Sequence, residues 1–412
     1  MGKAALIMVM GFSTALLMIG SNISKISNEA MDNYIHYYNS SMAHNIATAG
    51  TNLAARELWE NFAWTAGYTN VSFAGGTFSS TVTTAPGSNQ TRLTTTATFQ
   101  GETAMISVLL QPSSFSRFGY YSNVEGNIWW ISGDTVWGPM HTQDNLRVSG
   151  NPAFMQRTTS LKSIIYKSGP PPRDNPQFLG GYETGVNVSL PSNLNPLLTA
   201  ANNGGKVFSG PDSVYIEFQS NGNVKWKQGA GAAWNTDLLT TFAPNGVIYA
   251  NGTDVRVSGT LSGRVTIGAG GPTGNKKQGN IWIDNDIYYA HDPIAGSSTD
   301  LLGLVAENNI LVSDNDANRG NDITIQASCF SRSGSFTVEN YASRGVEGTI
   351  RLLGGIQQDE RGPVGTFGTD RHGNPYLANG YLKNYLYDNR LMYDAPPFFP
   401  TTGNYEIVSW FE

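Results

Sequence analysis

The hydrophobic pattern is strongest at the start of the chain. The segment Ala4–Ile19 reads AALIMVMGFSTALLMI and carries no charged residue. Apolar positions then recur with a helical period, and the first proline is Pro86. This pattern predicts one long helix that reaches about Phe62, apolar on all sides over its first third and amphipathic afterwards.

The next segment alternates apolar or β-branched residues with polar ones, which is typical of β-strands. Its three stretches read GTFSSTVTTA, TRLTTTATFQ and ETAMISVLLQ, and they are separated by short turn sequences. The alternation predicts a small antiparallel sheet within residues 63–125.

The rest of the chain, residues 126–412, repeats short apolar segments between corners rich in Asn, Asp and Gly. Three of these segments, Ile281–Ile283, Leu304–Ala306 and Ile323–Ile325, start 23 and 19 residues apart. Periods near 20 residues with short strands are typical of a parallel β-helix, also called a β-solenoid. A β-sandwich with Asn-rich hairpins is the alternative that this pattern leaves open.

A solenoid makes definite expectations about burial and pairing. Ile283, Val305 and Ile325 should point inward near one another, and residues 281–283 should pair in parallel with residues 304–306. The expected exposed corners are Thr253, Asp286 and Asn309.

The C-terminal segment is crowded with aromatic residues, which are Tyr376, Tyr381, Tyr385, Tyr387, Tyr393, Phe398, Phe399 and Tyr405. Such a segment can cover the open end of a solenoid, and it can also form a subunit interface. The whole chain is therefore predicted to be α+β and mostly β. We expect a helix over 1–62, an antiparallel sheet over 63–125 and a β-solenoid-like surface domain with an aromatic cap over 126–412.

The order of a long apolar helix and a small sheet resembles that of type IV pilins. The stretch TRLTTTATFQGETAMISVLLQPSSF is similar to the sheet of X-type pilus-assembly proteins, which are pilin-like. Residues 133–154 and 361–410 resemble segments of an uncharacterised domain attached to such proteins. The resemblance covers most of the chain, and it is specific for the architecture rather than for any activity.

The resemblance implies a structural subunit of an extracellular type IV pilus-like filament, or fimbrium, on the cell surface. Its helix would lie in the inner membrane before assembly and in the core of a helical homo-oligomer afterwards. The residues that would make the contacts between subunits are Ala4, Ala5, Leu6, Ile7, Gly11, Phe12, Ala15, Leu16 and Ile19.

The chain departs from the pilin pattern in one respect. Typical pilins carry a glutamate at mature position 5, which pairs with the terminal amine of a neighbour. If the mature chain begins at Met1, position 5 is Ala5. If it begins after Gly2 or after Gly11, position 5 is Ile7 or Leu16. None of these residues is acidic, and the first acidic residue is Glu29. The lack of this glutamate is a feature of some subunits at the filament tip. For a helix packed in a filament, we expect a leader peptide that is removed upstream of Met1.

Two other interpretations of the N-terminus remain open. One is a membrane protein with a single transmembrane anchor, since about 20 apolar residues span a bilayer and the run here is only slightly shorter. The other is a minor pilin at the filament tip. In either case the β domain would act in cell adhesion, with a glycan or a surface as its ligand.

Composition narrows the range of partners and cofactors. The 412 residues include 25 Lys and Arg against 31 Asp and Glu, which gives a net charge of −6. This balance argues against nucleic acid, which is bound through basic surfaces. The single cysteine, Cys329, excludes an intramolecular disulfide and a zinc or iron–sulfur site built on cysteines. We expect it to lie in a rung as a small buried hydrophobe.

Candidate chemistry in the sequence is sparse. The residues Asp314, Asp316 and Asn318 form a weak calcium candidate, but an EF-hand would need glycine and glutamate where Arg319 and Ile325 stand. No other cofactor or metal site is expected.

Enzyme motifs are equally scarce. Asp284 and Asp286 could provide the carboxylate pair of a polysaccharide-cleaving β-helix enzyme, and His141 is expected to make structural hydrogen bonds. The chain lacks the common hydrolase, phosphate-loop and metalloprotease motifs, so the sequence predicts no catalytic residues and no enzyme.

Overall fold

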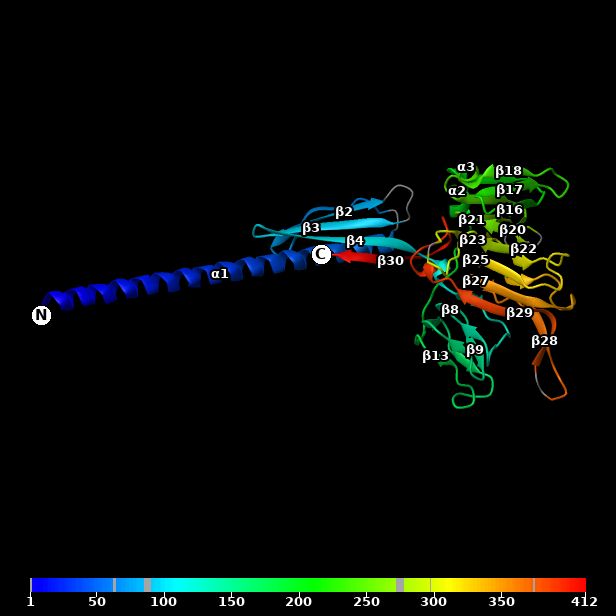
Figure 1. The fold of residues 1–412 in the computed structure, drawn as a ribbon, viewed down its shortest axis with the longest axis horizontal. Coiled ribbons are helices and arrows are strands. Elements are labelled where there is room, and N and C mark those ends of the chain that lie inside the picture. The colour runs from blue at the N-terminus through cyan, green and yellow to red at the C-terminus, as the bar shows by residue number, and fades with distance from the viewer. Residues whose placement is uncertain (1, 62–63, 85–89, 272–277, 297, 373–374) are drawn as a thin grey trace. The chain divides into compact units, whose positions relative to one another are not determined.

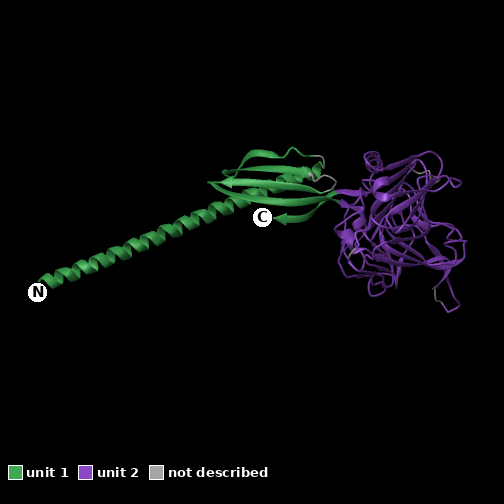
Figure 2. Cartoon of the chain, turned by 45° about the horizontal axis from the view of Figure 1, so that its top comes forward, with its two compact units in different colours: residues 1–112, 404–412 green, residues 113–403 purple. Residues whose placement is uncertain are grey.

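A computed structural model describes residues 2–61, 64–84, 90–271, 278–296, 298–372 and 375–412. The chain forms two compact units, which Figure 2 distinguishes by colour. Unit 1 consists of residues 1–112 and 404–412, and unit 2 consists of residues 113–403. The predicted fold class is confirmed: a long N-terminal helix is followed by an antiparallel sheet and then by stacked parallel strands.

Unit 1 combines one helix with one sheet (Figure 1). The elements are α1 (Gly2–Glu60), β1 (Tyr68–Phe73), β2 (Gly76–Thr84), β3 (Thr91–Phe99), β4 (Glu102–Ser114) and β30 (Thr401–Phe411). The strands lie in the order β1-β2-β3-β4-β30, and β1 to β4 pair antiparallel. The helix ends close to the predicted position, although Phe62 lies outside the described residues.

Only the second part of α1 packs on the sheet. Its buried apolar residues meet the inward-facing residues of β2, β3 and β4 in one core, which contains Ile46, Ala47, Ala54, Leu58, Phe78, Leu93, Ala97, Ile106, Val108 and Leu110. Residues 2–38 of the helix are exposed. The helix therefore becomes packed well after the predicted change to an amphipathic pattern, because residues 20–38 are exposed as well.

Gly50 lies where the helix packs tightly against the sheet. A Cβ atom at this position would lie 2.5 Å from Cδ2 of Phe78, whose ring is buried. Glycine in a helix is normally less favourable than alanine, so close packing is the physical reason for its presence here.

We expect Gly50→Ala to destabilise unit 1. The helical preference of alanine contributes up to about 1 kcal/mol, but overpacking of a filled core costs about 1–3 kcal/mol. The free energy of unfolding, measured by denaturant titration of the full chain in detergent, should fall. Gly20→Ala is the control because a Cβ there meets nothing within 4 Å. Equal stabilities of the two variants would contradict this packing.

Unit 2 is built around one continuous ladder of parallel strands, which we call the long ladder. In order across the ladder, its strands are β15 (Lys206–Ser209), β19 (Val247–Asn251), β21 (Arg264–Gly270), β23 (Leu301–Ala306), β25 (Ile323–Ser331), β27 (Val346–Glu360), β5 (Tyr120–Val124), β8 (Met140–Thr142), β11 (Thr158–Ser160) and β14 (Tyr182–Thr184). This arrangement is a parallel β-solenoid, as predicted, and not a sandwich.

Shorter parallel ladders form the other sides of the solenoid. The second ladder joins β16 (Val214–Phe218), β20 (Val255–Leu261), β22 (Ile281–Tyr289), β24 (Ile310–Val312) and β26 (Phe336–Val338). On a third side, the later part of β20 pairs with the later part of β22, and Ile287 of β22 pairs with Ile325 of β25. The early part of β25 pairs in turn with β27, and β27 pairs with β29 (Pro375–Tyr387).

The rungs near β5 continue these sides with two further parallel ladders. One contains β6 (Trp130–Ile131), β9 (Leu146–Ser149) and β12 (Ile164–Tyr166), and the other contains β7 (Thr135–Val136), β10 (Ala153–Phe154) and β13 (Gln177–Phe178). Antiparallel additions are β17 (Asn223–Gln228) and β18 (Asn235–Leu238) beside β16, and β28 (Gly365–Thr369) beside β29. The short helices are η1 (Phe115–Arg117), α2 (Asn195–Asn202), α3 (Leu239–Phe242) and η2 (Asn389–Met392).

The rungs are stacked in an order that differs from the order of the chain. The chain enters the stack in the middle, at β5, and proceeds to one end, at β14. It then crosses through α2 to the opposite end, at β15, and proceeds rung by rung to β27. There the last strand that the chain adds to the long ladder, β27, pairs with the first one, β5, with Ile356 opposite Tyr120. We call this junction between β27 and β5 the seam.

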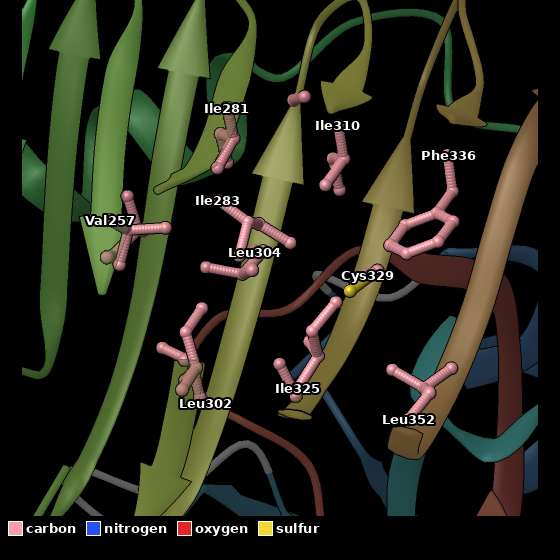
Figure 3. Close-up of a cluster of buried hydrophobic side chains, with 14 of the residues drawn as sticks. Val257, Ile281, Ile283, Leu302, Leu304, Ile310, Ile325, Cys329, Phe336 and Leu352 are labelled. Carbon is pink, nitrogen blue, oxygen red and sulfur yellow. The ribbon is translucent and has the colours of Figure 1, made fainter. Parts of the chain in front are cut away.

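Two hydrophobic layers hold the long ladder. The interior of the solenoid contains the apolar side chains drawn in Figure 3, among them Ile283, Leu304 and Ile325. The outer face of the ladder is also covered, because the crossing segment that includes Leu197 packs against it together with Phe399. Parallel strands that are buried on both faces have nearly continuous apolar sequences. Strand β23 is an example, since all of residues 301–306 are buried.

This double burial corrects the expected arrangement of the inward residues. Val305 is buried, but it faces the outer layer, and Leu304 takes the inward position in the interior cluster that also contains Ile283 and Ile325. Residues 281–283 pair in parallel with 310–312 rather than with 304–306. The expected partner lies on a different side of the solenoid, because the chain passes through a third side, residues 287–289, between the two segments.

The expected corner residues are less exposed than predicted. Thr253 is buried, and its hydroxyl donates to the carbonyl of Pro211 at 3.2 Å. Asp286 and Asn309 are partly buried, since neighbouring rungs stack over the corners as well as over the strands. Cys329 lies in the interior as predicted.

The prediction of an aromatic C-terminal cap is wrong. Tyr381 and Tyr385 belong to β29, which pairs with β27 beside the seam, and Phe399 packs on Phe330 in the outer layer. The β15 end of the stack carries instead a cluster of Phe208, Trp226 and Phe242, contributed by β15, β17 and α3. Tyr376, Tyr393 and Phe398 of the same segment are exposed, so aromatic crowding in the sequence does not by itself indicate a cap.

The division into units also differs from the expected boundaries of 63–125 and 126–412. Unit 2 begins at Ser113, and the last strand, β30, belongs to the sheet of unit 1 as the neighbour of β4. The two segments that lead into and out of unit 2 run together, because the amide of Phe115 donates to the carbonyl of Pro400 at 2.9 Å. The solenoid is therefore inserted between two neighbouring strands of the sheet.

Candidate functional site

The strongest candidate site is the free part of α1. The side chains of Leu6, Ile7, Phe12, Leu16 and Ile19 are all exposed, and the exposed fraction of Leu16 is 67%. Ala4, Ala5, Gly11 and Ala15 are exposed on the same segment. The structure thus gathers all the predicted assembly residues on one uncovered apolar helix.

This segment has the composition of a membrane-spanning helix. By length and hydropathy α1 could cross a bilayer, and the apolar window is not buried by the rest of the chain. The hydroxyl of Thr14 donates to the carbonyls of Met10 and Gly11 at 3.0 and 2.9 Å, so this polar group is satisfied within the helix. The surface of the segment is therefore suited to hydrocarbon or to other apolar helices.

A second notable site is a buried ion pair at the seam. Arg361 donates to Oε2 of Glu125 at 2.9 Å, and the side chains are 4% and 0% exposed. Trp130 also donates to this carboxylate, and its ring lies 3.8 Å from the guanidinium of Arg361. Because Glu125 precedes β6 and Arg361 follows β27, the pair joins the first and last rungs. The sequence offered no signal for it, since the residues are 236 positions apart.

A second ion pair crosses the seam nearby. Nζ of Lys383 on β29 lies 3.6 Å from Oδ1 of Asp134, which precedes β7. Burial lowers the pKa of Lys383, while the charge of Asp134 raises it and so opposes that effect. Asn123 also donates to Asp359 across the seam, at 2.8 Å.

The calcium candidate does not form a common set of ligands. Arg319 and Asn340 donate to the two carboxylate oxygens of Asp314 and lower its pKa. Asp316 is fully exposed, whereas the amide of Asn318 is buried and donates to the carbonyls of Ile283 and Ser313. Within the described part of the chain, no group of three or more His, Cys, Asp or Glu is placed to hold a metal ion.

Asp284 and Asp286 are engaged in structural contacts. Arg256 binds both oxygens of Asp284, at 2.7 and 2.8 Å, and the hydroxyl of Ser313 donates to it at 2.6 Å. Asp286 accepts the backbone amide of Thr324 at 2.6 Å. These carboxylates connect neighbouring rungs, and the arrangement gives no support to a catalytic pair.

His141 is fully buried between the long ladder and the outer layer. Its Nδ1 atom lies 2.7 Å from Oγ1 of Thr159, and its Nε2 atom lies 3.1 Å from Oε1 of Gln143. The ring stacks on Tyr121, with centroids 5.4 Å apart. Burial lowers the pKa of His141 to about 4. This histidine is a neutral structural residue, as the sequence predicted.

Comparison with known proteins finds similar solved structures but no family. No protein-family model matches the chain, and no curated protein matches it. A match among solved structures is the crystal structure of the competence-associated pilin ComZ from Thermus thermophilus. It has 12% identity and a TM-score of 0.40, and it covers 90% of this chain and 97% of that chain. At this level of similarity the match carries no argument about function.

The buried His141 makes stability depend on pH in a definite direction. Its pKa in the folded chain, about 4, is below the ordinary value of about 6.5, so the unfolded chain takes up a proton first. Stability should therefore fall as the pH decreases from about 6.5 to 4, by at most about 3 kcal/mol from this group. His141→Gln should reduce this pH dependence in urea titrations, whereas His372→Gln, at an exposed position, should not. Parallel curves for wild type and His141→Gln would refute the assignment.

Proposed function

We propose that the chain is a structural, non-enzymatic subunit of an extracellular type IV pilus-like filament, which assembles through the first part of α1. The observation that carries the proposal is the uncovered apolar segment Ala4–Ile19 on a helix whose other part is packed in a folded unit. An apolar surface of this extent requires a partner in water. Lipid can be that partner before assembly, and the same helix of other subunits can be the partner afterwards.

The positions of the charges support a membrane stage. Lys3 precedes the apolar segment, and the next charged residue is Lys25. At 1.5 Å per residue the helix between them is roughly 33 Å long, which matches the thickness of about 30 Å of a hydrocarbon core. The inner membrane is thus a suitable location for the subunit before assembly.

The packed part of α1 supports repeated assembly. Because Ile46, Ala54 and Leu58 lie in the core of unit 1, the sheet holds the helix in one rotational setting. Every copy then presents its apolar segment in the same way, which is the condition for a helical homo-oligomer. A single anchor in the membrane would use the same segment without contacts between subunits.

We expect Leu16→Asp to abolish filaments while the β-strands still fold. A carboxylate in the middle of an apolar helix bundle has no partner there, and its burial costs several kcal/mol by rough estimate. Electron microscopy of sheared surface material from cells that carry the variant is the measurement. Ile294→Asp is the matched control, because Ile294 is 78% exposed in unit 2. Normal filaments with Leu16→Asp would rule out this segment as the core.

Register between subunits should depend on the small residues, since the segment contains no carboxylate. Small side chains allow helices to approach closely, and a Cβ at Gly11 would meet nothing within its own chain. Gly11→Leu should therefore reduce filament yield in the same assay by disturbing contacts between copies. Met10→Leu conserves volume at a neighbouring position and should assemble normally. Equal yields from the two variants would argue against close helix contacts at Gly11.

A further inference from the structure

A pocket of about 290 Å³ lies at the seam of the solenoid. Residues of the first rung, including Trp129 and Asp134, line one side, and residues of the last rung, including Phe367 and Lys383, line the other. The long ladder is continuous across the seam, but β6 and β7 are the edge strands of their own ladders. The pocket is thus a consequence of rungs that are joined on one side of the solenoid only.

The walls of this pocket are largely aromatic. Trp129, Trp130, Phe367 and Tyr385 all line it. Small-molecule sites are concave and mainly apolar, with a few polar groups that fix the orientation of the ligand. At about 290 Å³ the pocket is near the lower end of such sites, so it suits a ligand of one or two small rings.

The charges in the wall cancel in pairs. Arg361 is bound to Glu125, and Trp130 covers its guanidinium, so it is not available to a ligand anion. Lys383 lies 3.6 Å from Asp134, which leaves room for both groups to bind a third partner. An ammonium group only donates and a carboxylate only accepts, whereas a hydroxyl does both. Two adjacent hydroxyls could accept from Lys383 and donate to Asp134.

We propose that the seam pocket binds one uncharged sugar ring, as the end of a glycan or as a free saccharide. The apolar face of the ring lies against the aromatic wall, and neighbouring hydroxyls bind Lys383 and Asp134. This activity is adhesion to neutral glycans, and it is independent of filament assembly. A flat apolar ligand without hydroxyls would use the aromatic wall but not the ion pair, which distinguishes the two cases.

The test uses the full chain in a polyoxyethylene detergent, because a detergent with a sugar head group would compete. Arrays of immobilised neutral and acidic glycans, followed by titration with free monosaccharides, measure the affinity. We expect binding to at least one neutral glycan. Phe367→Ala and Lys383→Met should each lower the affinity at least tenfold. Phe367 is 54% exposed, and methionine at position 383 keeps an unbranched apolar stem while it removes the ammonium group.

Trp234→Ala is the matched control, because it removes an exposed aromatic residue of unit 2 outside the pocket. Its affinity should equal that of the wild type, and thermal unfolding should show that all variants are folded. The proposal is overturned by the absence of binding to any neutral glycan or by binding restricted to acidic glycans. It is also overturned by equal affinities of wild type and both pocket variants. Loss through Phe367→Ala alone would indicate an apolar ligand instead. None of these results bears on assembly, which the Leu16→Asp variant tests separately.

Discussion

The pairing of β27 with β5 is the interaction on which the architecture of unit 2 depends. The solenoid is inserted between β4 and β30, which are neighbours in one sheet, so the chain must leave unit 2 beside the point where it enters. A solenoid stacked in chain order has its two ends at opposite poles. The rung order found here meets the constraint, because the chain starts in the middle of the stack and returns to the middle.

This order of rungs requires a junction between segments that are far apart in the sequence. The backbone ladder closes the junction on one side, and the Glu125–Arg361 pair closes it in the interior. Burial of two charges is costly, and a well-packed apolar pair could be as stable, so we interpret the ion pair as a device for register. Displacement of the seam by one rung would leave both charges buried without a partner.

Helix α1 uses one kind of surface in two ways. Around Gly50 its apolar side chains are covered by the sheet, whereas around Gly11 similar side chains are uncovered. The part around Gly50 stabilises unit 1, and the part around Gly11 stays exposed. The fold of the single chain therefore leaves the apolar surface of the N-terminal part of the helix uncovered.

The sequence by itself determined the features that depend on local periodicity. The long helix with its apolar first segment, the antiparallel strands and the presence of a solenoid follow from spacings of a few to about twenty residues. Burial of Cys329 and the structural role of His141 could be predicted on the same basis.

Only the tertiary structure decided which rungs are neighbours. Apolar triplets such as Ile281–Ile283 and Leu304–Ala306 carry the same pattern whether they stack on each other or lie on different sides of one rung. The outward burial of Val305, the position of Tyr385 beside the seam and the return of β30 to the first sheet all depend on contacts between distant segments. The seam and its pocket arise from these contacts, and a pattern along one strand contains no information about its distant partner.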